Sequence, residues 1–476
     1  MPKVIFAAES ARLADHGVNT GERLVNLVPE AASEAARSPL VLRCVAGLAT
    51  FGGALAGGGA GVAVIAATEL TGTTGTMYVL SGRDVSGTIT YYLDSVTTGG
   101  TVTALGNFNG SGFVDRNGTI ETNNGFVTIA VGGMYRLWNI GTPGLSAPTG
   151  GAFSNVGSLA YLDGYTIISE NAGPQIMWTG LADPTSLDAL DFATKEGRTD
   201  NMFRIIASQG RLYLMGRNST EIWANTGLAN AEAFARIPGA VYDVGIRSRA
   251  LAVSAFDSLW IVSDDQKVMQ WRGGEHQAVS NRAIEDAIAG EIPTSMYAYE
   301  ARGQKFIGLR FLSRPAWEFN TNSGLWHERS AANDTGAATG LAATVQSNSL
   351  WHGFVETSTG AVSMRFADVR TEGGAAYNRL ARSRTLEQDG RVFRIPELEA
   401  RFGPSRGGAS FTVTMRHSSD GGATWSTGRA RTILATSPNG RAKWNGLGSA
   451  RVFMAELAFA STDPAPLEAA AIVRVV

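Results

Sequence analysis

The sequence predicts an all-β protein: a β-propeller of about six blades followed by an antiparallel C-terminal β-domain, with little helix. Three observations lead to this fold class. Short strand-turn-strand units recur along the chain, helical patterns are sparse, and 58 glycines accompany only 15 prolines. Frequent glycine between β-branched and aromatic runs favours short strands joined by tight turns. With 476 residues, the chain is long enough to bury a large core.

The recurring units supply the period that a propeller needs. Their starts are separated by 49, 33, 52, 48, 46 and 44 residues, and most of these distances are close to the length of a four-stranded blade. The units begin at Met77, Phe126, Leu159, Arg211, Leu259, Lys305 and Ser349. A large sandwich array is the competing interpretation. Large aromatic residues near the strand ends are expected to fill the core between sheets: Trp138, Trp178, Trp223, Trp260, Trp271 and Trp326.

We expect three regions: an N-terminal arm at 1–45, the propeller at 46–375 and the C-terminal β-domain at 376–476. The stretch 45–68 carries no charged residue and is long enough to span a bilayer. Glycine and alanine dominate it, however, so a buried, glycine-bent strand region is the expected structure. The N-terminal apolar run is too short for a signal peptide.

Helix is expected in two places. Residues 280–291 place Ile284 and Ile288 one turn apart on one face, with Ser280 or Asn281 as the cap and Gly290 as the end. The alanine-rich segment 31–38 is expected to add one or two turns.

After a polar connector that begins near residue 375, the remaining segments alternate apolar and polar residues, as antiparallel strands do. The stretch SSDGGATW fits S-x-D-x-G-x-T-W with Ser418, Asp420, Gly422, Thr424 and Trp425. This pattern resembles the Asp-box, a hairpin signature of sialidase propellers. Its chemistry is structural, because the aspartate accepts backbone N–H bonds, the glycine adopts positive φ and the tryptophan is expected to anchor the hairpin in the core.

A carbohydrate-binding or sialidase-like protein is the alternative that this motif raises. Sialidases carry several boxes, an arginine triad and a tyrosine nucleophile, whereas one box occurs here and no arginine falls in an assignable motif. We therefore interpret the box as a stiff hairpin in a structural domain.

The composition narrows the function classes further. Charged residues make up 17% of the chain and the formal net charge is −2, so no basic face for tight nucleic-acid binding is indicated. Cys44 is the single cysteine, which excludes an internal disulfide. The sequence contains no phosphate-binding loop, nucleophile elbow or zinc-protease motif. The histidines show no metal-ligand spacing: His16, His276, His327, His352 and His417.

We accordingly predict no catalytic, cofactor-binding or metal-binding residues, no cofactor and no enzymatic activity. The acidic pairs Asp264-Asp265 and Glu285-Asp286 and the series Asp183, Asp188 and Asp191 are expected to be solvated or to cap turns and helix starts. The C-terminal arginines are expected on outer faces of edge strands or in subunit contacts, with phosphate contact as the alternative: Arg429, Arg431, Arg441 and Arg451.

A family resemblance rests on an ordered series of phrases. The strongest is a strand followed by G-x-x-[ST]-[ST]-E-x-W, here Gly216, Ser219, Thr220, Glu221 and Trp223. Others are ERLVNLVPE at 22–30, FARIPGAVYDVGI at 234–246, GLWHER at 324–329 and KWNGLGSARVFMAEL at 443–457. Together they resemble the packaged DNA stabilisation protein of short-tailed phages, a tail hub or nozzle protein. One departure is Glu318-Phe319, where that family often has a Tyr-Asp pair.

This resemblance implies a virion protein of the phage tail, made in the host cytoplasm. It implies a homo-oligomeric ring, expected to be a hexamer, attached to the portal and the head-to-tail adaptor. The ring would close the DNA channel, retain the packaged genome and carry tail fibres, spikes or a needle. Genomic DNA would pass through it without sequence-specific binding, and no membrane insertion is expected. The low net charge suits such a channel, since strong Lys and Arg contacts to phosphates would hold the DNA.

Overall fold

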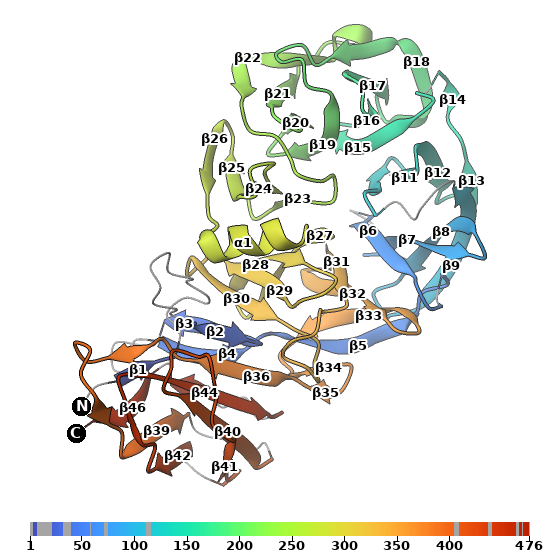
Figure 1. Ribbon diagram of the computed structural model, residues 1–476. Coiled ribbons are helices and arrows are strands. Elements are labelled where there is room, and N and C mark those ends of the chain that lie inside the picture. Colours follow the sequence, from blue (N-terminus) through green and yellow to red (C-terminus); the bar gives the residue numbers. More distant parts are fainter. Residues whose placement is uncertain are drawn as a thin grey trace.

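The computed structural model describes residues 3–6, 21–31, 40–57, 59–70, 75–110, 116–151, 153–403, 409–436, 440–462, 466–468 and 470–475. Strands dominate these residues and are arranged as a ring of small sheets with a separate strand-rich part at one end (Figure 1). The all-β propeller fold expected from the sequence is therefore confirmed.

Each of the first five blades is an antiparallel meander of four consecutive strands. Blade 1 consists of β6(Ala63–Glu69), β7(Met77–Val85), β8(Thr88–Val96) and β9(Val102–Gly110), and blade 2 of β10(Thr119–Asn123), β11(Phe126–Val131), β12(Met134–Asn139) and β13(Gly144–Ser146). Blade 3 consists of β15(Val156–Leu162), β16(Tyr165–Glu170), β17(Gln175–Gly180) and β18(Asp183–Thr194), with the short β14(Thr149–Gly150) beside β18. Blade 4 consists of β19(Met202–Ser208), β20(Arg211–Gly216), β21(Thr220–Asn225) and β22(Phe234–Tyr242). The short 3-10 helix η1(Asn230–Glu232) lies between β21 and β22. Blade 5 consists of β23(Ala252–Ala255), β24(Ser258–Val262), β25(Val268–Arg272) and β26(Glu275–Ala278).

The last two blades connect the propeller to the ends of the chain. Blade 6 consists of β27(Ser295–Ala301), β28(Gln304–Arg310), β29(Ala316–Asn320) and β30(Leu325–Arg329). Blade 7 consists of β31(Leu341–Ser347), β32(Leu350–Thr357) and β33(Gly360–Ala367), and its fourth strand is β5(Gly47–Ala54) from the start of the chain. The short strands β34(Thr371–Glu372) and β35(Ala375–Ala376) extend this sheet beyond β5. The propeller is therefore closed by a strand from the N-terminal side.

The described chain forms seven blades, one more than the approximate number expected. The innermost strands contact one another in a closed circle, in the order β6, β10, β15, β19, β23, β27, β31 and back to β6. Each of the seven units found in the sequence lies in a different blade. The six intervals between units suggested about six blades, whereas the seventh blade is completed only by residues 47–54, far away in sequence.

A separate hydrophobic cluster fills each interface between neighbouring blades. Side chains of an inner strand alternate between the two neighbouring interfaces, because successive residues of a strand point to opposite faces of the sheet. The tryptophans expected in the core all lie in these clusters: Trp138, Trp178, Trp223, Trp260, Trp271 and Trp326.

The helix α1(Arg282–Gly290) confirms the prediction for residues 280–291. The Asn281 side chain accepts a hydrogen bond from the Ile284 N–H at 3.2 Å, and Ile284 and Ile288 are buried between blades 5 and 6. The second expected helical segment, 31–38, lies outside the described residues except for Ala31, which belongs to a strand. In the described part of the chain no helix is long and apolar enough to cross a membrane, and residues 45–68 contain β5 and most of β6.

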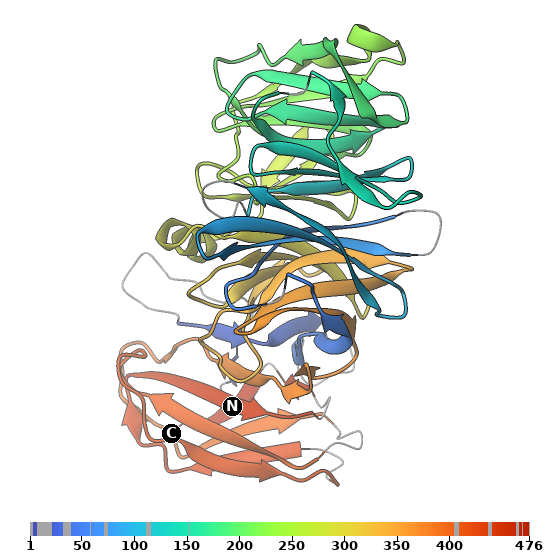
Figure 2. The same ribbon diagram turned by 90° about the vertical axis from the view of Figure 1, so that its right-hand side faces the viewer.

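The C-terminal strands form two packed sheets below blades 6 and 7 (Figures 1 and 2). One sheet contains β36(Asn378–Arg382), β44(Val452–Ala460), β40(Phe411–Ser418) and β41(Arg429–Ile433), with β37(Leu386–Glu387) paired to β44. The other contains β39(Glu397–Phe402), β42(Gly440–Asn445), β45(Leu467–Glu468) and β46(Ala470–Arg474). A single hydrophobic cluster that includes Trp444 and Phe453 fills the space between them. A two-stranded ribbon, β38(Phe393–Arg394) with β43(Ser449–Ala450), completes this part.

The described residues of the predicted N-terminal arm, 1–45, belong to these same sheets. Strand β1(Lys3–Ile5) pairs with β46, β4(Leu40–Cys44) pairs with β45, and β3(Leu27–Ala31) pairs with β4. Strand β2(Arg23–Val25) lies between β30 of blade 6 and β36, so one ten-stranded sheet runs from the propeller into the C-terminal part. Apart from β3 with β4, the pairing partners lie hundreds of residues apart, which is why sequence pattern does not show them.

Candidate functional site

The segment GLWHER contains β30, the outer strand of blade 6, at the junction between the propeller and the C-terminal sheets. Trp326 is buried between blades 5 and 6, where its indole N–H donates to the Val279 carbonyl at 3.0 Å. His327, Glu328 and Arg329 are also buried. Because buried charges are costly unless they are paired, their partners explain this segment.

Glu318 and Arg329 form an ion pair whose side chains are both fully buried. The Arg329 Nε–H donates to Glu318 Oε1 at 2.7 Å, and His327 Nε2 lies 2.9 Å from Glu318 Oε2. The hydroxyls of Tyr297 and Tyr299 donate to the two oxygens of the same carboxylate at 2.9 and 2.8 Å. The carboxylate therefore accepts four hydrogen bonds inside blade 6.

This environment keeps Glu318 ionised. Burial by itself raises the pKa of Glu318, but the Arg329 charge and the hydrogen bonds from His327 and Tyr299 outweigh burial and lower the pKa to about 2. Burial raises the pKa of the Tyr299 hydroxyl, so it remains a hydrogen-bond donor. A buried charged pair whose carboxylate is held by several hydrogen bonds is a structural arrangement.

The remaining N–H groups of Arg329 hold together the two chain segments that enter and leave the propeller. Nη2 donates to the Ala46 carbonyl at 3.0 Å, directly before β5. Nη1 donates to the Tyr377 hydroxyl at 2.9 Å, directly before β36. We call Ala46, Tyr299, Glu318, Arg329 and Tyr377 the clasp. It joins blade 6 to the chain on both sides of the propeller.

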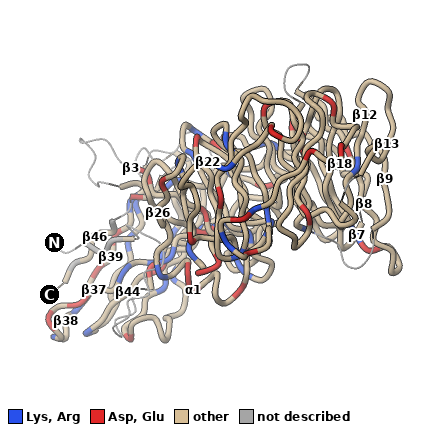
Figure 3. The backbone as a smooth tube through the Cα atoms, turned by 90° about the horizontal axis from the view of Figure 1, so that it is seen from above, with Lys and Arg blue, Asp and Glu red and all other residues tan. Residues whose placement is uncertain are grey.

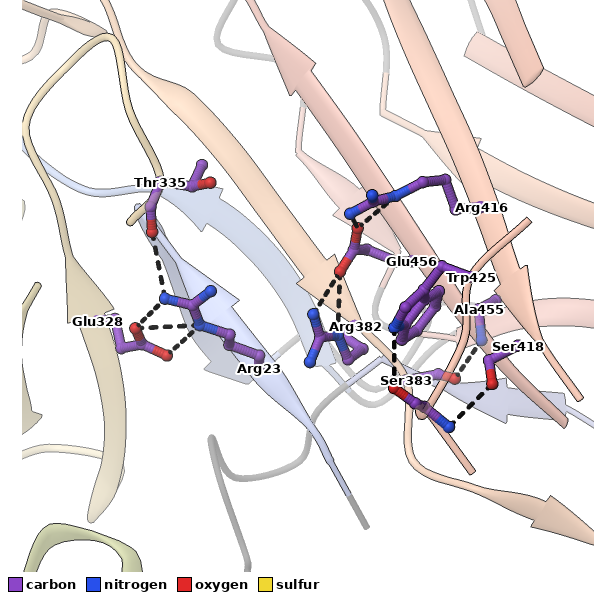
Figure 4. A network of polar contacts seen from close by, with 11 residues as sticks. Arg23, Glu328, Thr335, Arg382, Ser383, Arg416, Ser418, Trp425, Ala455 and Glu456 are labelled. Atoms are coloured by element: carbon purple, nitrogen blue, oxygen red, sulfur yellow. Dashed lines mark hydrogen bonds and ion pairs between the residues drawn. The ribbon is translucent and has the colours of Figure 1, made fainter. Parts of the chain in front are cut away.

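A second set of polar contacts ties β2 to its neighbours (Figure 4). The Arg23 guanidinium binds the Glu328 carboxylate through Nε at 2.8 Å and Nη2 at 2.7 Å. The Asn26 amide donates to Ser330 Oγ at 2.7 Å and to the Asn378 carbonyl at 2.8 Å. Two-point binding of a carboxylate fixes geometry as well as charge. These contacts hold the propeller and the C-terminal sheets in one orientation across the shared sheet.

Farther along the same sheet, Glu456 on β44 holds two arginines (Figure 4). Arg382 on β36 donates to its Oε2 through Nε at 2.9 Å and Nη2 at 2.7 Å. Arg416 on β40 donates to its Oε1 through Nε at 3.0 Å and also through Nη2. The Trp425 ring lies against both guanidinium groups. Its centroid is 4.8 Å from Arg382 Cζ and 5.9 Å from Arg416 Cζ. Arginine over an indole face is a favourable cation–π contact.

The Asp-box therefore folds as a hairpin, but its tryptophan is not where we expected it. Asp420 accepts the Thr424 N–H at 2.9 Å, and Gly422 has φ +96° and donates to Ser418 Oγ at 2.8 Å. Hydrogen bonds from the Ser418 and Thr424 hydroxyls hold the pKa of Asp420 well below its usual range. Trp425 is only half-buried and covers the arginines instead of entering the core. The core position is filled by Trp444.

The motif from Gly216 to Trp223 fixes the turn between β20 and β21 in blade 4. Asp200 accepts backbone N–H bonds from Asn218 at 2.8 Å and Ser219 at 2.9 Å. The buried Lys195 donates to Ser219 Oγ at 2.7 Å. The buried Glu221 accepts from the Gly197 N–H at 2.6 Å and from the Trp223 indole at 3.0 Å. The motif thus anchors segment 195–201, which links blade 3 to blade 4.

The acidic pairs singled out in the sequence have structural partners. Asp264 pairs with Arg217 and Arg247, Asp265 with Lys267, and Asp286 with Arg282. Glu285 accepts from Ser280 Oγ at 3.1 Å. Asp183, Asp188 and Asp191 all lie on β18, the outer strand of blade 3.

The C-terminal arginines close the seam between the two C-terminal sheets. Arg429 and Arg431 on the edge strand β41 donate to the Asn445 and Lys443 carbonyls of β42 at 2.7 and 2.9 Å. Arg441 pairs with Glu399 at 2.7 Å. Arg451 is exposed at the end of β43.

The described residues contain no group of three or more His, Cys, Asp and Glu that could hold a metal ion. A cavity of about 570 Å³ beside blade 7 is lined by Arg116, Arg310 and Glu356. Glu356 accepts from Arg310 at 2.7 Å and from Arg116 at 2.9 Å, so the charges of this cavity already compensate one another. The prediction that no residue has a catalytic, cofactor-binding or metal-binding role remains a prediction.

The sequence indicated the phrases GLWHER and G-x-x-[ST]-[ST]-E-x-W but not what they do. Arg329 reaches Ala46 and Tyr377, and no periodicity connects these positions. The signal that was available is compositional: His, Glu and Arg follow one another directly after a tryptophan in a short strand.

The comparison with protein families agrees with this architecture. Residues 20–327 match the sequence profile of the family described as Phage_stabilise, Bacteriophage P22 Gp10, beta-propeller. No curated protein matches the sequence. Among solved structures, the computationally designed Ika8 protein is similar with a TM-score of 0.38 and 12% identity, over 67% of this chain and 100% of that one.

Two structures of the BT4673 extracellular domain from B. thetaiotaomicron each give a TM-score of 0.44 and 10% identity. They cover 67% and 76% of this chain, which spans 40% and 44% of theirs. The profile match covers more than half of the chain and includes both the Gly216–Trp223 motif and the first half of β30. The protein is therefore a member of the phage stabilisation family of bacteriophage P22 Gp10, with a β-propeller fold.

Proposed function

We propose that this chain is the subunit of a ring, a hexamer, that is mounted on the portal and head-to-tail adaptor of a short-tailed phage. The ring closes the DNA channel and retains the packaged genome mechanically. It also serves as the platform on which tail fibres, spikes or a needle attach. The support is family membership together with one structural observation, the clasp that ties blade 6 to both ends of the propeller.

A protein that holds back pressurised DNA needs a stiff body. The clasp and the bonds of Arg23 to Glu328 fasten the propeller and the C-terminal sheets to each other at a shared sheet. Buried, fully bonded polar networks favour one conformation over looser alternatives. A force on either end is thereby transmitted through backbone pairing and charged side chains together.

The pairing of arginines is consistent with a channel that does not grip DNA. On one face of the propeller Arg198 pairs with Asp243 at 2.9 Å, and Arg247 pairs with Asp264 at 3.3 Å. An arginine that is already paired with a carboxylate gives little net attraction to phosphate, and weak attraction lets DNA slide.

The experiment is production of particles that lack this protein, followed by complementation with the wild-type chain. Particles without it are expected to fill and then lose their DNA, and complementation restores retention. Electron microscopy of the complemented tail should show a coaxial ring of six copies below the adaptor. Particles that keep their genome without the protein would refute the retention role.

The carbohydrate-binding or sialidase-like alternative rested on the Asp-box. In the described structure the aromatic residue of this box lies against Arg382 and Arg416, so its ring already has cation–π partners within the chain. A screen with fluorogenic glycosides is expected to show no turnover. Turnover that disappears on mutation of a described carboxylate would revive the enzyme hypothesis.

A further inference from the structure

The low net charge of the chain conceals a separation of charge between its two ends. Residues 149–194, which include blade 3, contain five carboxylates and no Lys or Arg. Residues 376–476 contain 14 Lys and Arg against 8 Asp and Glu, a net formal charge of +6. Blade 3 and the C-terminal sheets lie at opposite ends of the molecule (Figures 2 and 3).

At the acidic end, β18 forms an exposed and irregular edge. Its pairing with β17 shifts register between Met177–Phe192 and Thr179–Leu187, so residues 188–191 bulge out of the sheet. The neighbouring strand β14 pairs only with Ser186 and Leu187. Large apolar side chains are exposed here: Leu190 by 72%, Leu181 by 64% and Phe192 by 41%. We call Leu181, Asp183, Asp188, Leu190, Asp191 and Phe192 the acidic edge.

The carboxylates of this edge lack a cation within the described residues of blade 3. Asp188 accepts the Leu190 N–H at 2.9 Å, and Asp183 accepts from Thr185. Burial and the neighbouring Asp188 raise the pKa of Asp191, a sign of like-charge repulsion. Exposed apolar side chains surrounded by carboxylates are typical of an interaction surface. A partner of positive charge would fit this one.

At the other end, the ribbon of β38 and β43 presents three exposed arginines. The side chains of Arg391, Arg394 and Arg451 make no hydrogen bond or ion pair to the part of the chain that the structure describes. Val392 is exposed by 61% between the first two. We call Arg391, Val392, Arg394 and Arg451 the arginine tip. Two acidic residues, Glu387 and Asp389, precede it along the chain and reduce its local charge without pairing with it.

We propose that the acidic edge of one copy binds the arginine tip of the next copy. The inference rests on the proposed ring and identifies its subunit contact. Because the two patches differ and carry opposite charge, the contact is heterologous, and such contacts form a closed ring when the rotation per subunit divides the circle. A two-fold contact of either patch with itself would bring like charges together, which is unfavourable.

Disulfide trapping tests the contact directly. Cys44 is buried and is the only cysteine, so a C44S background carries the engineered pair D191C and R394C without interference. The protein is mixed with the portal and adaptor complex and oxidised. The double variant is expected to give a ladder of multimers, whereas each single variant stays monomeric under the same conditions. Dimers from a single variant, or no ladder from the double one, would overturn the proposal.

Charge exchange provides the second test. Both D188R/D191R and R391E/R394E are expected to weaken ring assembly by about tenfold, because several rim charges are reversed. A chain that carries both sets is expected to assemble again, since the complementarity is restored with the signs exchanged. The control is R282E/D286R, which exchanges an exposed pair on α1. Equal effects of the control and the test variants would sink the proposal.

Loss of this contact and loss of the ring itself give different experimental results. A ring seen by electron microscopy without cross-linking between positions 191 and 394 removes this contact and leaves the proposed function standing. Absence of any ring on the portal and adaptor complex overturns the contact and the ring together.

Discussion

Replacement of Arg329 by methionine is expected to destabilise the protein by about 3–5 kcal/mol. The change leaves the Glu318 carboxylate fully buried without its cation, and breaking a buried pair by removing one partner costs this amount. It also removes the bonds to the Ala46 carbonyl and the Tyr377 hydroxyl. The pKa of Glu318 gives a similar magnitude for the lost stability. Its decrease from 4.5 to about 2 corresponds to about 3 kcal/mol.

The assay combines urea unfolding, followed by tryptophan fluorescence, with amide hydrogen exchange. Exchange should accelerate at residues 46–54 and 377–382, because R329M releases both segments from blade 6. The matched control is R282M, an exposed arginine paired with Asp286 on α1, for which a loss of about 0.5 kcal/mol is expected. The double variant E318Q/R329M should be more stable than R329M alone, since no uncompensated charge remains.

The pH dependence has a defined sign. The folded pKa of Glu318 lies below its unfolded value, so its contribution is present above pH 4.5 and is lost as pH falls toward 2. R329M should lack this loss. The reasoning would be refuted if R329M resembled R282M in stability, or if exchange at residues 46–54 were unchanged.

Three further predictions concern other parts of the fold. G216A should lower stability by about 1–3 kcal/mol, because an added Cβ would lie 2.1 Å from Asp200 Oδ2 and 2.8 Å from the Asn201 carbonyl oxygen. Thermal unfolding measures this loss, and G53A is the control because open space surrounds Gly53. D420A should expose the hairpin 419–428 to proteolysis, because the Thr424 N–H loses its acceptor. D389A is the control and should leave this hairpin protected. Equal cleavage of both variants would contradict the role of the Asp-box. Burial and Arg365 lower the pKa of His352 to about 4, so stability should fall as pH decreases from 6.5 to 4, where the unfolded chain binds the extra proton. H352Q should flatten this decrease in unfolding temperature between pH 7 and 5, and an unchanged slope would show that other groups dominate.

Sequence pattern predicted the propeller because blades 1 to 6 are each built from strands that follow one another in the chain. The turn at Asp163-Gly164, for example, joins β15 to β16 within one unit. The blade number was less accessible, since blade 7 takes its fourth strand from residues 47–54. The spacing of the units was uneven because the unit at Leu159 begins in β15, the inner strand of its blade, whereas the other units begin at the second strand.

The candidate site was visible only as fragments. GLWHER shows three polar residues in a strand, but the partner of Arg329 at Ala46 lies 283 residues away. The Asp-box predicted its own turn correctly, because Asp420 and Thr424 are close in sequence. It did not predict the position of Trp425, because the arginines that hold this ring are fixed by Glu456 on another strand. Local chemistry can be read from spacing, whereas contacts between distant strands cannot.

The position of β1 and β2 has a consequence for how the chain is made. These strands leave the ribosome long before β46, which is the described partner of β1. Strand β2 pairs with β30 and β36, which follow it in the chain by more than 300 residues. A prematurely terminated chain therefore retains unpaired strand edges, which promote aggregation and removal. The two C-terminal sheets can therefore form only after strands from both the N-terminal and the C-terminal segments have been made.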